Sequence, residues 1–455
     1  MKKLFLGFLL VLLALSAVAL WLKSSRVHSG KIVLSYACVE FWAKRDQVAL
    51  FEKLNPQYEV KIDVGNTEAE KVIVQSLAGV GPDFFNAYSA SQAAAFINVG
   101  IAWDITEEMK AAGIDVAGDT WPATHAFVLR DGRVYGFPYA AHTDALFFNK
   151  GIFDSLGIPY PESPLSRDAF LDLAKKLTVR DENGRVKHYG FIFRRDIHWL
   201  DLMRQWGGHV YSSDGTRCEL DIPENIEAVQ FLCDLVWKYR VSPSPAEETS
   251  MATAGGWGSG PVTLFGGGRA AMALGGRYFL VPFRQKDQYP NLRLGVADYQ
   301  FGPKPGHAGY AGCVMINRNS PLREDALAYL KYMASAPYNE LVNSQADGMA
   351  PVKRFASTEA FLHNPAHAEE DRNEVWRQVL ETSVPEEVTP FINGAVASRI
   401  IAEQLDLAFG NQKTADEALK AAAHEINAEI AKNLKKSKDL KARYDALRAG
   451  KVGPT

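Results

Sequence analysis

Short apolar strands alternate with amphipathic helices along the first hundred residues, and this order constrains the fold more than any other feature. Strands are predicted over 32–37, 58–64 and 81–89, and helices over 47–54 and 68–78. Within 58–64, apolar residues occupy every second position, as in a strand with one buried face. Strands that alternate with helices of this length predict right-handed crossovers and a mainly parallel sheet. The expected fold class is therefore α/β.

The chain has 455 residues, which is too long for one compact core and favours two domains. A turn at 135–138 leads into a strand, 145–148 is a second apolar strand, and Asn149 opens a helix that ends at Gly157. A new α/β unit therefore begins after about residue 145. The segment just before it is predicted to connect two lobes.

Later segments continue the helical pattern. A helix is predicted within 222–239, and Thr414 with Glu417 forms a capping box that opens another helix near the C-terminus. Trp199 and Trp206 lie seven residues apart on a predicted helix, which indicates core packing for both.

The N-terminus carries an export signal. Two lysines precede an apolar run from Leu4 to Leu22, and Ala17-Val18-Ala19 suits a signal peptidase. The run also approaches the length that spans a bilayer, so an uncleaved anchor is the alternative. In both cases we expect the bulk of the protein at the periplasmic or extracellular face of the cytoplasmic membrane.

Composition narrows the classes of partner and chemistry. A net charge of −3 favours neither nucleic acid nor an acidic surface. The four cysteines are too scattered for a disulfide framework or a zinc site, although Cys218 and Cys233 could pair in an oxidising compartment. Neither a metal nor a cofactor is expected. The motifs HExxH, GxSxG and GxxxxGK[ST] are absent from the sequence.

Polar clusters follow the predicted strands of the first lobe. They fall at Val39–Trp42, at Gly65–Thr67 and at Asn86–Ser89. Because ligands of open α/β sheets bind beyond the carboxyl ends of the strands, these clusters are candidate parts of a binding site.

Four segments, taken in order, resemble the carbohydrate-type family 1 of extracellular solute-binding proteins of ABC importers. YGFPYAAHTDALFFNKGIFDSLGI at 135–158 is similar to the family's inter-lobe signature. The others are SGPVTLFGGGRAAMALGGRYFL at 259–280, AGCVMINRNSPLREDALAYLKYMAS at 311–335 and AHEINAEIAKNL at 423–434.

The resemblance implies a periplasmic-binding-protein-like fold, with two α/β lobes joined by a multi-crossover hinge. After a leader at 1–29, lobe 1 would take 30–143 plus about 300–345, and lobe 2 would take 144–299 plus about 346–455. It also implies a monomeric receptor that is not an enzyme. Such a receptor closes on a small molecule, most often a mono- or oligosaccharide, and delivers it to the permease of an ABC importer.

A cleft for sugars should combine hydrogen-bonding side chains with flat aromatic rings, because sugars offer both hydroxyl groups and apolar C–H faces. Trp42 and Asp144 also have structural interpretations, as core and as hinge support. Arg277 could pair with an acidic sugar. The candidate ligand-binding residues are Glu40, Trp42, Tyr88, Ser89, His142, Asp144, Trp257, Ser259, Arg277, Tyr278 and Tyr310.

Two alternatives stay open at this point. The same fold could bind a polyamine, a glycerol-phosphate compound or iron, although the ten dispersed histidines lower the case for iron. An exported carbohydrate-active enzyme would instead need two carboxylates about 5–9.5 Å apart across the cleft.

Overall fold

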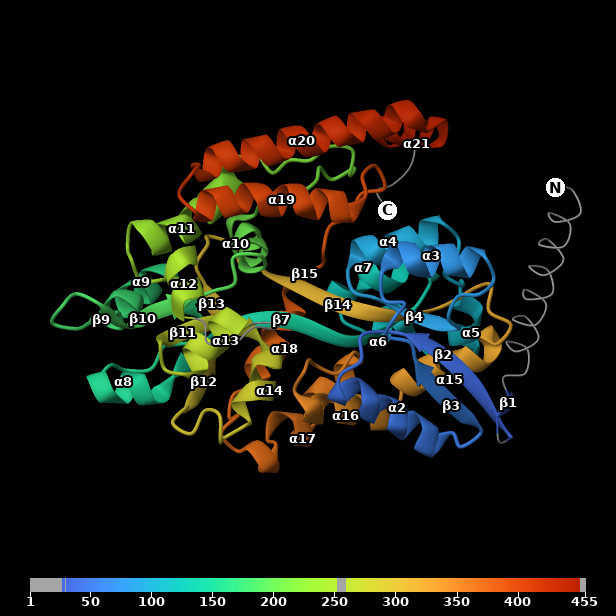
Figure 1. Ribbon diagram of the computed structural model, residues 1–455, viewed down its shortest axis with the longest axis horizontal. Helices are drawn as coiled ribbons and strands as arrows, with labels where there is room; N and C mark the ends of the chain where they lie inside the picture. The colour runs from blue at the N-terminus through green and yellow to red at the C-terminus, as the bar shows by residue number, and fades with distance from the viewer. Residues whose placement is uncertain (1–26, 29, 252–258, 451–455) are drawn as a thin grey trace, which may run out of the picture.

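A mixed sheet of eleven strands runs through both lobes of the molecule (Figure 1). The computed structural model describes residues 27–28, 30–251 and 259–450, so the predicted leader at 1–29 lies outside the described residues except for 27–28. The strands of this sheet are β1 (Val27–His28), β2 (Lys31–Ala37), β3 (Tyr58–Ile62), β4 (Phe84–Ala87), β7 (Phe137–Asn149), β9 (Val179–Arg180), β10 (Val186–Ile192), β11 (Ala270–Gly276), β12 (Leu294–Ala297), β14 (His307–Ile316) and β15 (Ser383–Val384).

The first lobe, on the right in Figure 1, contains β2 paired in parallel with β3 and β4, as the sequence predicts. Its small hairpin joins β5 (Leu129–Arg130) to β6 (Arg133–Val134). The helices around this part of the sheet are α2 (Trp42–Leu54), α3 (Ala69–Leu77), α4 (Ala90–Asn98), α5 (Thr106–Ala111), α6 (Val116–Asp119), η1 (Pro122–Thr124), α7 (His125–Val128), α15 (Arg323–Met333) and α16 (Ala336–Gln345).

The second lobe contains β9 to β12 and a short parallel pair of β8 (Leu165–Ser166) and β13 (Tyr299–Gln300). Its helices are α8 (Lys150–Leu156), α9 (Arg167–Lys176), α10 (His198–Trp206), α11 (Pro223–Trp237), α12 (Pro245–Met251), α13 (Ser259–Gly266), η2 (Arg277–Phe279), α14 (Leu280–Phe283), η3 (Lys353–Ser357), α17 (Glu359–Leu362), η4 (Pro365–His367), α18 (Asn373–Glu381), α19 (Gly394–Phe409), α20 (Ala415–Lys436) and α21 (Lys438–Arg448).

Strand β7 joins the two lobes. It pairs with β14 from Phe137 to Thr143, and with β11 from Asp144 to Phe148. The sequence predicted a turn and a second strand at 145–148, but the structure has one strand of 13 residues. The polar residues in the middle of β7 do not interrupt the strand, because their side chains contact or hydrogen-bond residues of other elements.

The expectation of mainly parallel pairing is wrong for the sheet as a whole. β14 is antiparallel to β4 and β7, and β11 and β12 are both antiparallel to β7. The long strands β7 and β14 cross between the lobes in opposite directions, and of the other described strands beside them only β15 is parallel to its neighbour. The α/β class holds, with parallel pairing confined to β2–β3, β2–β4, β10–β11, β8–β13 and β14–β15.

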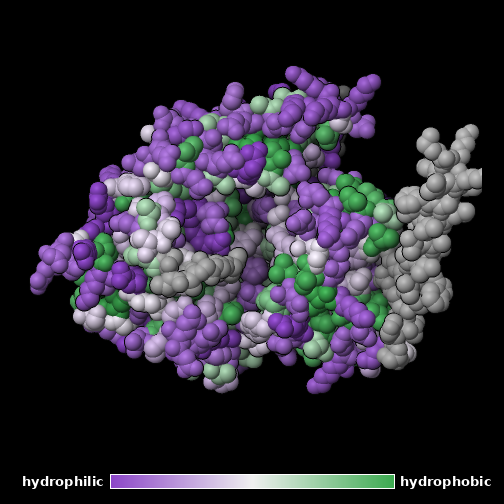
Figure 2. Space-filling view, viewed as in Figure 1, coloured by the Kyte–Doolittle hydropathy of each residue, from purple (hydrophilic) through white to green (hydrophobic). Residues whose placement is uncertain are grey.

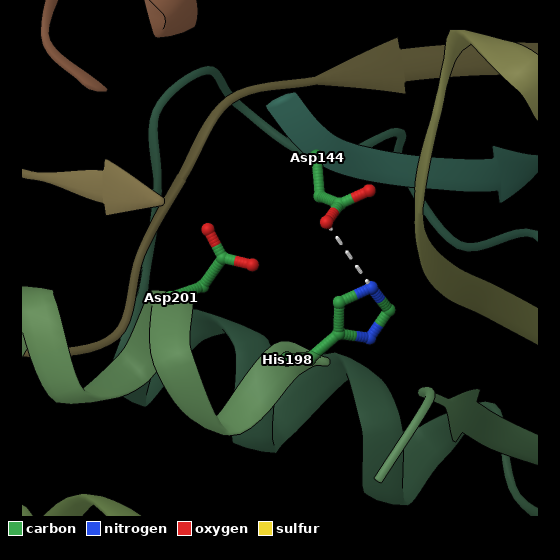
Figure 3. A group of neighbouring side chains, drawn as sticks. All are labelled: Asp144, His198 and Asp201. Atoms are coloured by element: carbon green, nitrogen blue, oxygen red, sulfur yellow. Dashed lines mark ion pairs between the residues drawn. The ribbon is translucent and has the colours of Figure 1, made fainter. Parts of the chain in front are cut away.

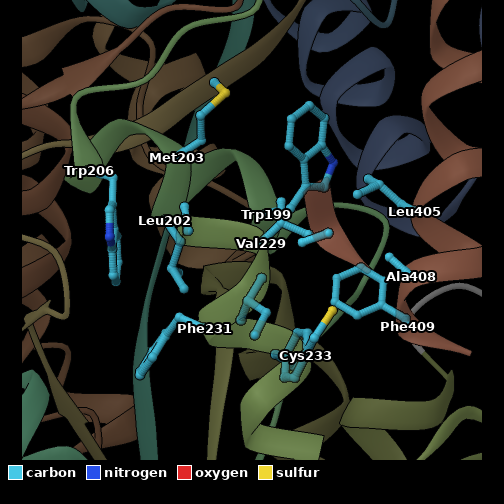
Figure 4. Close-up of a cluster of buried hydrophobic side chains, with 14 of the residues drawn as sticks. Trp199, Leu202, Met203, Trp206, Val229, Phe231, Cys233, Leu405, Ala408 and Phe409 are labelled. Atoms are coloured by element: carbon cyan, nitrogen blue, oxygen red, sulfur yellow. The ribbon is translucent and has the colours of Figure 1, made fainter. Parts of the chain in front are cut away.

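Buried side chains form three clusters on the two sides of this sheet. In the second lobe, α10, α11 and α19 contribute Trp199, Phe231 and Phe409 to one cluster (Figure 4). Trp199 and Trp206 are both buried, which confirms the core interpretation of this helix. Cys218 and Cys233 are free, buried thiols in the same cluster.

Local signals near helix ends behave as the sequence predicts. The capping box of Thr414 and Glu417 opens α20, and Gly157 ends α8 in the left-handed conformation with φ 64°. Within the described ranges, no helix combines the length and apolar character needed to cross a bilayer. The lobe boundaries at 143/144 and about 345 stay a prediction, although β7 exchanges β14 for β11 at 143/144.

Candidate functional site

A cavity of about 250 Å³ lies between the two lobes. The first lobe contributes the start of α4, the second lobe contributes α10 and α19, and the floor is formed by β14 and residues 384–392. A neighbouring cavity of about 530 Å³ shares Ser91, Thr389, Ile392, Gly394 and Ser398 with it, so the two form one cleft. Figure 2 shows the surface hollowed between the lobes.

The N-termini of two helices from opposite lobes meet in this cleft. Ser89 caps α4 by accepting a hydrogen bond from the Gln92 N–H, and the Ser89 and Ser91 hydroxyl oxygens lie 2.9 Å apart. Asn393 caps α19 in the same way. A methyl group at Gly394 would lie 2.2 Å from the Ser91 Cβ, so the lobes touch at a point with no room for a side chain.

Two consecutive glutamates hold the segment between β15 and α19 against opposite lobes. Glu386 accepts a hydrogen bond of 3.0 Å from the Ala90 N–H at the start of α4, where a helix favours a negative charge. Burial raises the pKa of the Glu386 carboxyl, and its hydrogen bonds to the α4 backbone oppose that shift. The first lobe therefore supplies the hydrogen bonds that stabilise the Glu386 carboxylate.

Glu387 belongs to the second lobe. Its carboxylate pairs with the Arg204 guanidinium on α10, which is only 9% exposed. It also accepts hydrogen bonds of 2.9 Å and 2.8 Å from the N–H groups of Val210 and Tyr211. Adjacent carboxylates thus fasten one crossing segment to both halves of the molecule.

The segments that follow β2 and β4 in the first lobe come together because these strands are neighbours. The Val39 N–H donates to the Tyr88 hydroxyl at 2.6 Å, and Asn86 donates to the same oxygen at 3.2 Å. Burial raises the pKa of Tyr88 to about 12. Trp42 is 44% exposed at the first residue of α2, so it is not packed beneath the helix. Glu40 is exposed and lies 3.5 Å from Arg45.

His142, Asp144, Tyr278 and Tyr310 form a second group, at the point where the strands cross. The rings of His142 and Tyr310 stack with centroids 5.7 Å apart. The Tyr310 hydroxyl donates to Asp144 at 2.9 Å, and its ring lines the cavity. Burial, then the neighbouring Asp144 carboxylate, raises the pKa of Tyr278. Burial lowers the pKa of His142.

Arg277 is not brought to the cleft. Its guanidinium is 3% exposed and donates to the carbonyls of Asn343 and Gly348 at 3.3 Å and 2.8 Å. Glu370 lies 4.0 Å away, and the Phe361 ring lies beneath the guanidinium carbon at 4.8 Å. Its charge is therefore matched inside the protein, which disfavours the pairing with an acidic sugar.

Two predicted residues cannot be placed. Trp257 lies outside the described residues, and Ser259 begins α13 with a side chain that is likewise outside them. Their roles stay predictions.

The sequence interpretation missed the crossing segment at 384–398. Ser91, Glu386, Glu387, Gly394 and Ser398 all line the cleft, yet none was a candidate. The Asn393-Gly394 pair before an apolar helix is a recognisable start signal. What the sequence did not indicate is that this helix begins beside α4, about 300 residues earlier in the chain.

Several charged side chains near the cleft have partners within the protein. On the second-lobe side, Arg194 pairs with Asp196 at 2.6 Å, Arg195 pairs with Glu248 at 2.6 Å, and Arg204 is paired as described above. On the first-lobe side, Lys44 is buried, donates to Gln47 at 2.9 Å and lies 4.6 Å above the Tyr139 ring centroid. Burial lowers the pKa of Lys44.

One buried group, Asp144, His198 and Asp201, has the residue types of a metal site. Their candidate ligand atoms lie within 4.8 Å of one another (Figure 3). His198 does not fit that role, because its Nδ1 accepts the Arg194 N–H at 2.9 Å. The neutral ring then carries its hydrogen on Nε2, the atom that would have to bind the metal.

Two α/β lobes, crossing strands and a cleft between them are the architecture of bacterial solute-binding receptors. Residues 39–340 match the family described as bacterial extracellular solute-binding protein, and the chain belongs to this family.

Solved structures share the fold across most of the chain. A substrate-binding protein of Listeria monocytogenes in complex with cycloalternan has a TM-score of 0.73 at 22% identity, and the match covers 88% of this chain and 99% of that one. A maltose-bound protein of T. maritima has a TM-score of 0.69 at 20% identity, with 86% and 98% covered.

Curated relatives match over shorter stretches. A binding protein of Brucella abortus is 27% identical over 241 residues, which are 51% of this chain and 54% of that protein. The maltotriose-binding protein of Pyrococcus abyssi is 25% identical over 223 residues, or 46% and 44% of the two chains. The chain thus spans about half the length of the curated relatives it matches.

Proposed function

We propose that this protein captures a neutral mono- or oligosaccharide between its lobes and delivers it, chemically unchanged, to the permease of an ABC importer. The observation that carries the proposal is the chemistry of the cleft. The hydroxyl-bearing residues Ser89, Ser91 and Thr389 and the aromatic residues Tyr211 and Tyr310 line the cleft, while Glu387 and Arg204 already pair with each other. A neutral, hydroxyl-rich ligand suits such walls.

Polar groups in a closing cleft must be matched, because each unmade hydrogen bond costs about 1–3 kcal/mol. Sugars can satisfy the serine and threonine hydroxyls and stack their C–H faces on rings such as Trp42 and Tyr88. The relatives named for maltotriose and for arabinooligosaccharide support the same class of ligand.

The alternative cargoes fit less well. A polyamine needs several unpaired carboxylates, but Glu386 is bound to the α4 backbone and Glu387 to Arg204, which leaves the exposed Glu70 as the only other cleft acid among the described residues. A phosphate compound needs free cations, and Arg204, Arg194 and Arg195 each pair with an acid. Iron would need clustered ligands, and the one such group among the described residues is the buried one discussed above.

The enzyme alternative is also disfavoured. Glycoside hydrolysis needs two carboxylates that face the substrate about 5–9.5 Å apart. In the described part of the chain, three acids line the cleft: Glu386 and Glu387 bind opposite lobes through their carboxylates, and Glu70 lies exposed on α3. We therefore propose a receptor that works as an exported monomer, with its leader either cleaved or kept as an anchor.

The proposed mechanism is a hinge motion about the crossing strands. A ligand that touches both lobes favours the closed form, and it can shift the balance only by its differential affinity for the two forms. The permease would then recognise the closed surface.

A thermal-shift screen tests the proposal, since a ligand that binds only the folded state raises the melting temperature. The panel is glucose, maltose, maltotriose and arabinotriose, with spermidine and glycerol 3-phosphate as controls. We expect stabilisation by at least one sugar and by neither control. Stabilisation by spermidine or glycerol 3-phosphate alone, or release of smaller sugars from maltotriose, would contradict it.

A further inference from the structure

Three fully buried polar side chains meet where the lobes join (Figure 3). Asp144 lies on β7 at the residue where this strand exchanges β14 for β11 as its partner. His198 and Asp201 lie on the same face of α10, three residues apart. All three are 0% exposed, so each unmatched atom here has a large cost.

The hydrogen bonds of the cluster fix where its protons lie. Because the His198 Nδ1 accepts from a backbone N–H, its Nε2 carries hydrogen, and this atom lies 3.5 Å from the Asp144 Oδ2. The Asp201 Oδ1 accepts the Ala308 N–H of β14 at 2.8 Å. The Asp201 Oδ2 makes no hydrogen bond to the described residues. Figure 3 shows the Asp201 carboxyl group beside Asp144 and His198.

Two carboxylates in one dry site cannot both be ionised at modest cost. Burial, then the Asp144 charge, raises the pKa of Asp201 well above its ordinary value. For Asp144, burial acts in the same direction, but His198 and the Tyr310 hydroxyl outweigh it and lower the pKa. The proton therefore belongs on Asp201 and the charge on Asp144.

We propose that Asp201 is a protonated carboxylic acid that donates to the Asp144 carboxylate, and that this bond fixes Tyr310 at the floor of the cleft. One carboxyl group on α10 then holds both crossing strands, through Asp144 on β7 and the Ala308 N–H on β14. Asp144 in turn receives the Tyr310 hydroxyl. Asp201 is thus a positioning residue for the proposed binding site. Its expected effect on ligand affinity rests on the proposed function of that site.

Other ionisable groups surround the pair, so the test must separate Asp201 from them. His307, beside Ala308, pairs with Asp298 at 3.0 Å. The titratable or charged side chains that act on the pair from the elements packed against it are Arg194, His198, Arg204, Tyr278, Tyr299, Tyr310 and His142.

The sharpest test compares the wild type with Asp201→Asn. The amide keeps the acceptor for Ala308 and supplies a permanent donor to Asp144, so it imitates the protonated acid. A folded-state pKa above the unfolded one means that folding takes up a proton, and stability is lost as pH rises toward the folded pKa. Between about pH 5 and about pH 7, the unfolding constant of the wild type should rise relative to that of the variant by about tenfold per pH unit.

Denaturant unfolding at each pH gives that ratio without any ligand. Asp172→Asn on α9, a surface acid paired with Lys176, is the matched control and should show a constant ratio. A constant ratio for Asp201→Asn would overturn the proposal. If that variant does not fold, the infrared absorption spectrum of the wild type at neutral pH decides, because a protonated-carboxyl band there supports the proposal and its absence overturns it.

Two further measurements complete the test. Adding Zn²⁺ or Mn²⁺ to the wild type should leave its melting temperature unchanged, and a rise that Asp201→Asn abolishes would make the cluster a cation site and refute the shared proton. Asp201→Ala should weaken sugar affinity several-fold while Asp201→Asn keeps it; equal affinities would refute the link to Tyr310. If no sugar binds the wild type, the proposed function fails while the folding comparison still stands.

Discussion

Gly394 marks the place where the lobes touch, and replacing it with alanine should push them apart. Its φ is not positive, so alanine fits the backbone at the start of α19. The added methyl would lie 2.2 Å from the Ser91 Cβ, whereas carbon atoms in contact lie about 3.5–4.0 Å apart. The two helix starts must therefore separate by about 1.5 Å at this point.

The cost should appear in ligand affinity rather than in folding. Overpacking of a close contact costs about 1–3 kcal/mol. Because this contact joins the lobes, the cost falls on the closed form, and sugar affinity should drop roughly 5- to 150-fold. Within one lobe, alanine in place of glycine favours the helix by about 0.5–1 kcal/mol, so the melting temperature of the free protein should not fall.

Isothermal titration with the sugar found in the thermal-shift screen measures the effect. The control introduces Gly394→Ala into the Ser91→Gly variant, which lacks the opposing Cβ, and there it should cause little further loss of affinity relative to Ser91→Gly alone. Unchanged affinity for Gly394→Ala in the wild type, or an equal loss in the Ser91→Gly background, would refute the inference that this contact limits closure.

Two further variants separate ligand binding from folding. Trp42→Ala should weaken sugar binding by about 2- to 12-fold, the equivalent of about 0.5–1.5 kcal/mol of ring stacking, with little change in melting temperature; a lower melting temperature at unchanged affinity would show that the indole serves the core instead. Glu387→Ala should cost about 3–5 kcal/mol in urea unfolding, because it leaves the buried Arg204 without its acidic partner and two backbone N–H groups unmatched. A loss below about 0.5 kcal/mol, as at an exposed ion pair, would contradict that account.

Local sequence signals predicted the elements whose causes are local. The alternation in 58–64 became β3 (Tyr58–Ile62), and the capping box at Thr414 became the start of α20. The ends of β2 and β4 also came together, because neighbouring parallel strands bring their carboxyl ends to one edge, and the Val39 N–H donates to the Tyr88 hydroxyl there.

Signals that depend on distant partners were not predictable. In the sequence, the polar residues His142 and Asp144 indicate an interruption of the strand. In the structure, Tyr310, more than 160 residues later, stacks on His142 and donates a hydrogen bond to Asp144. Arg277 read as a cleft residue, because nothing near it in sequence shows that Glu370 would balance its charge. Glu386 gains its role only once the segment at 384–394 lies beside α4.

The central claim is that two lobes close around a sugar and leave it intact. Small-angle scattering of the full chain, with and without the sugar found in the screen, tests it most directly. The account predicts a smaller radius of gyration with the sugar, no change with spermidine, and recovery of the sugar unaltered. Saturating sugar that leaves the scattering profile unchanged, or that is recovered as shorter products, would contradict it.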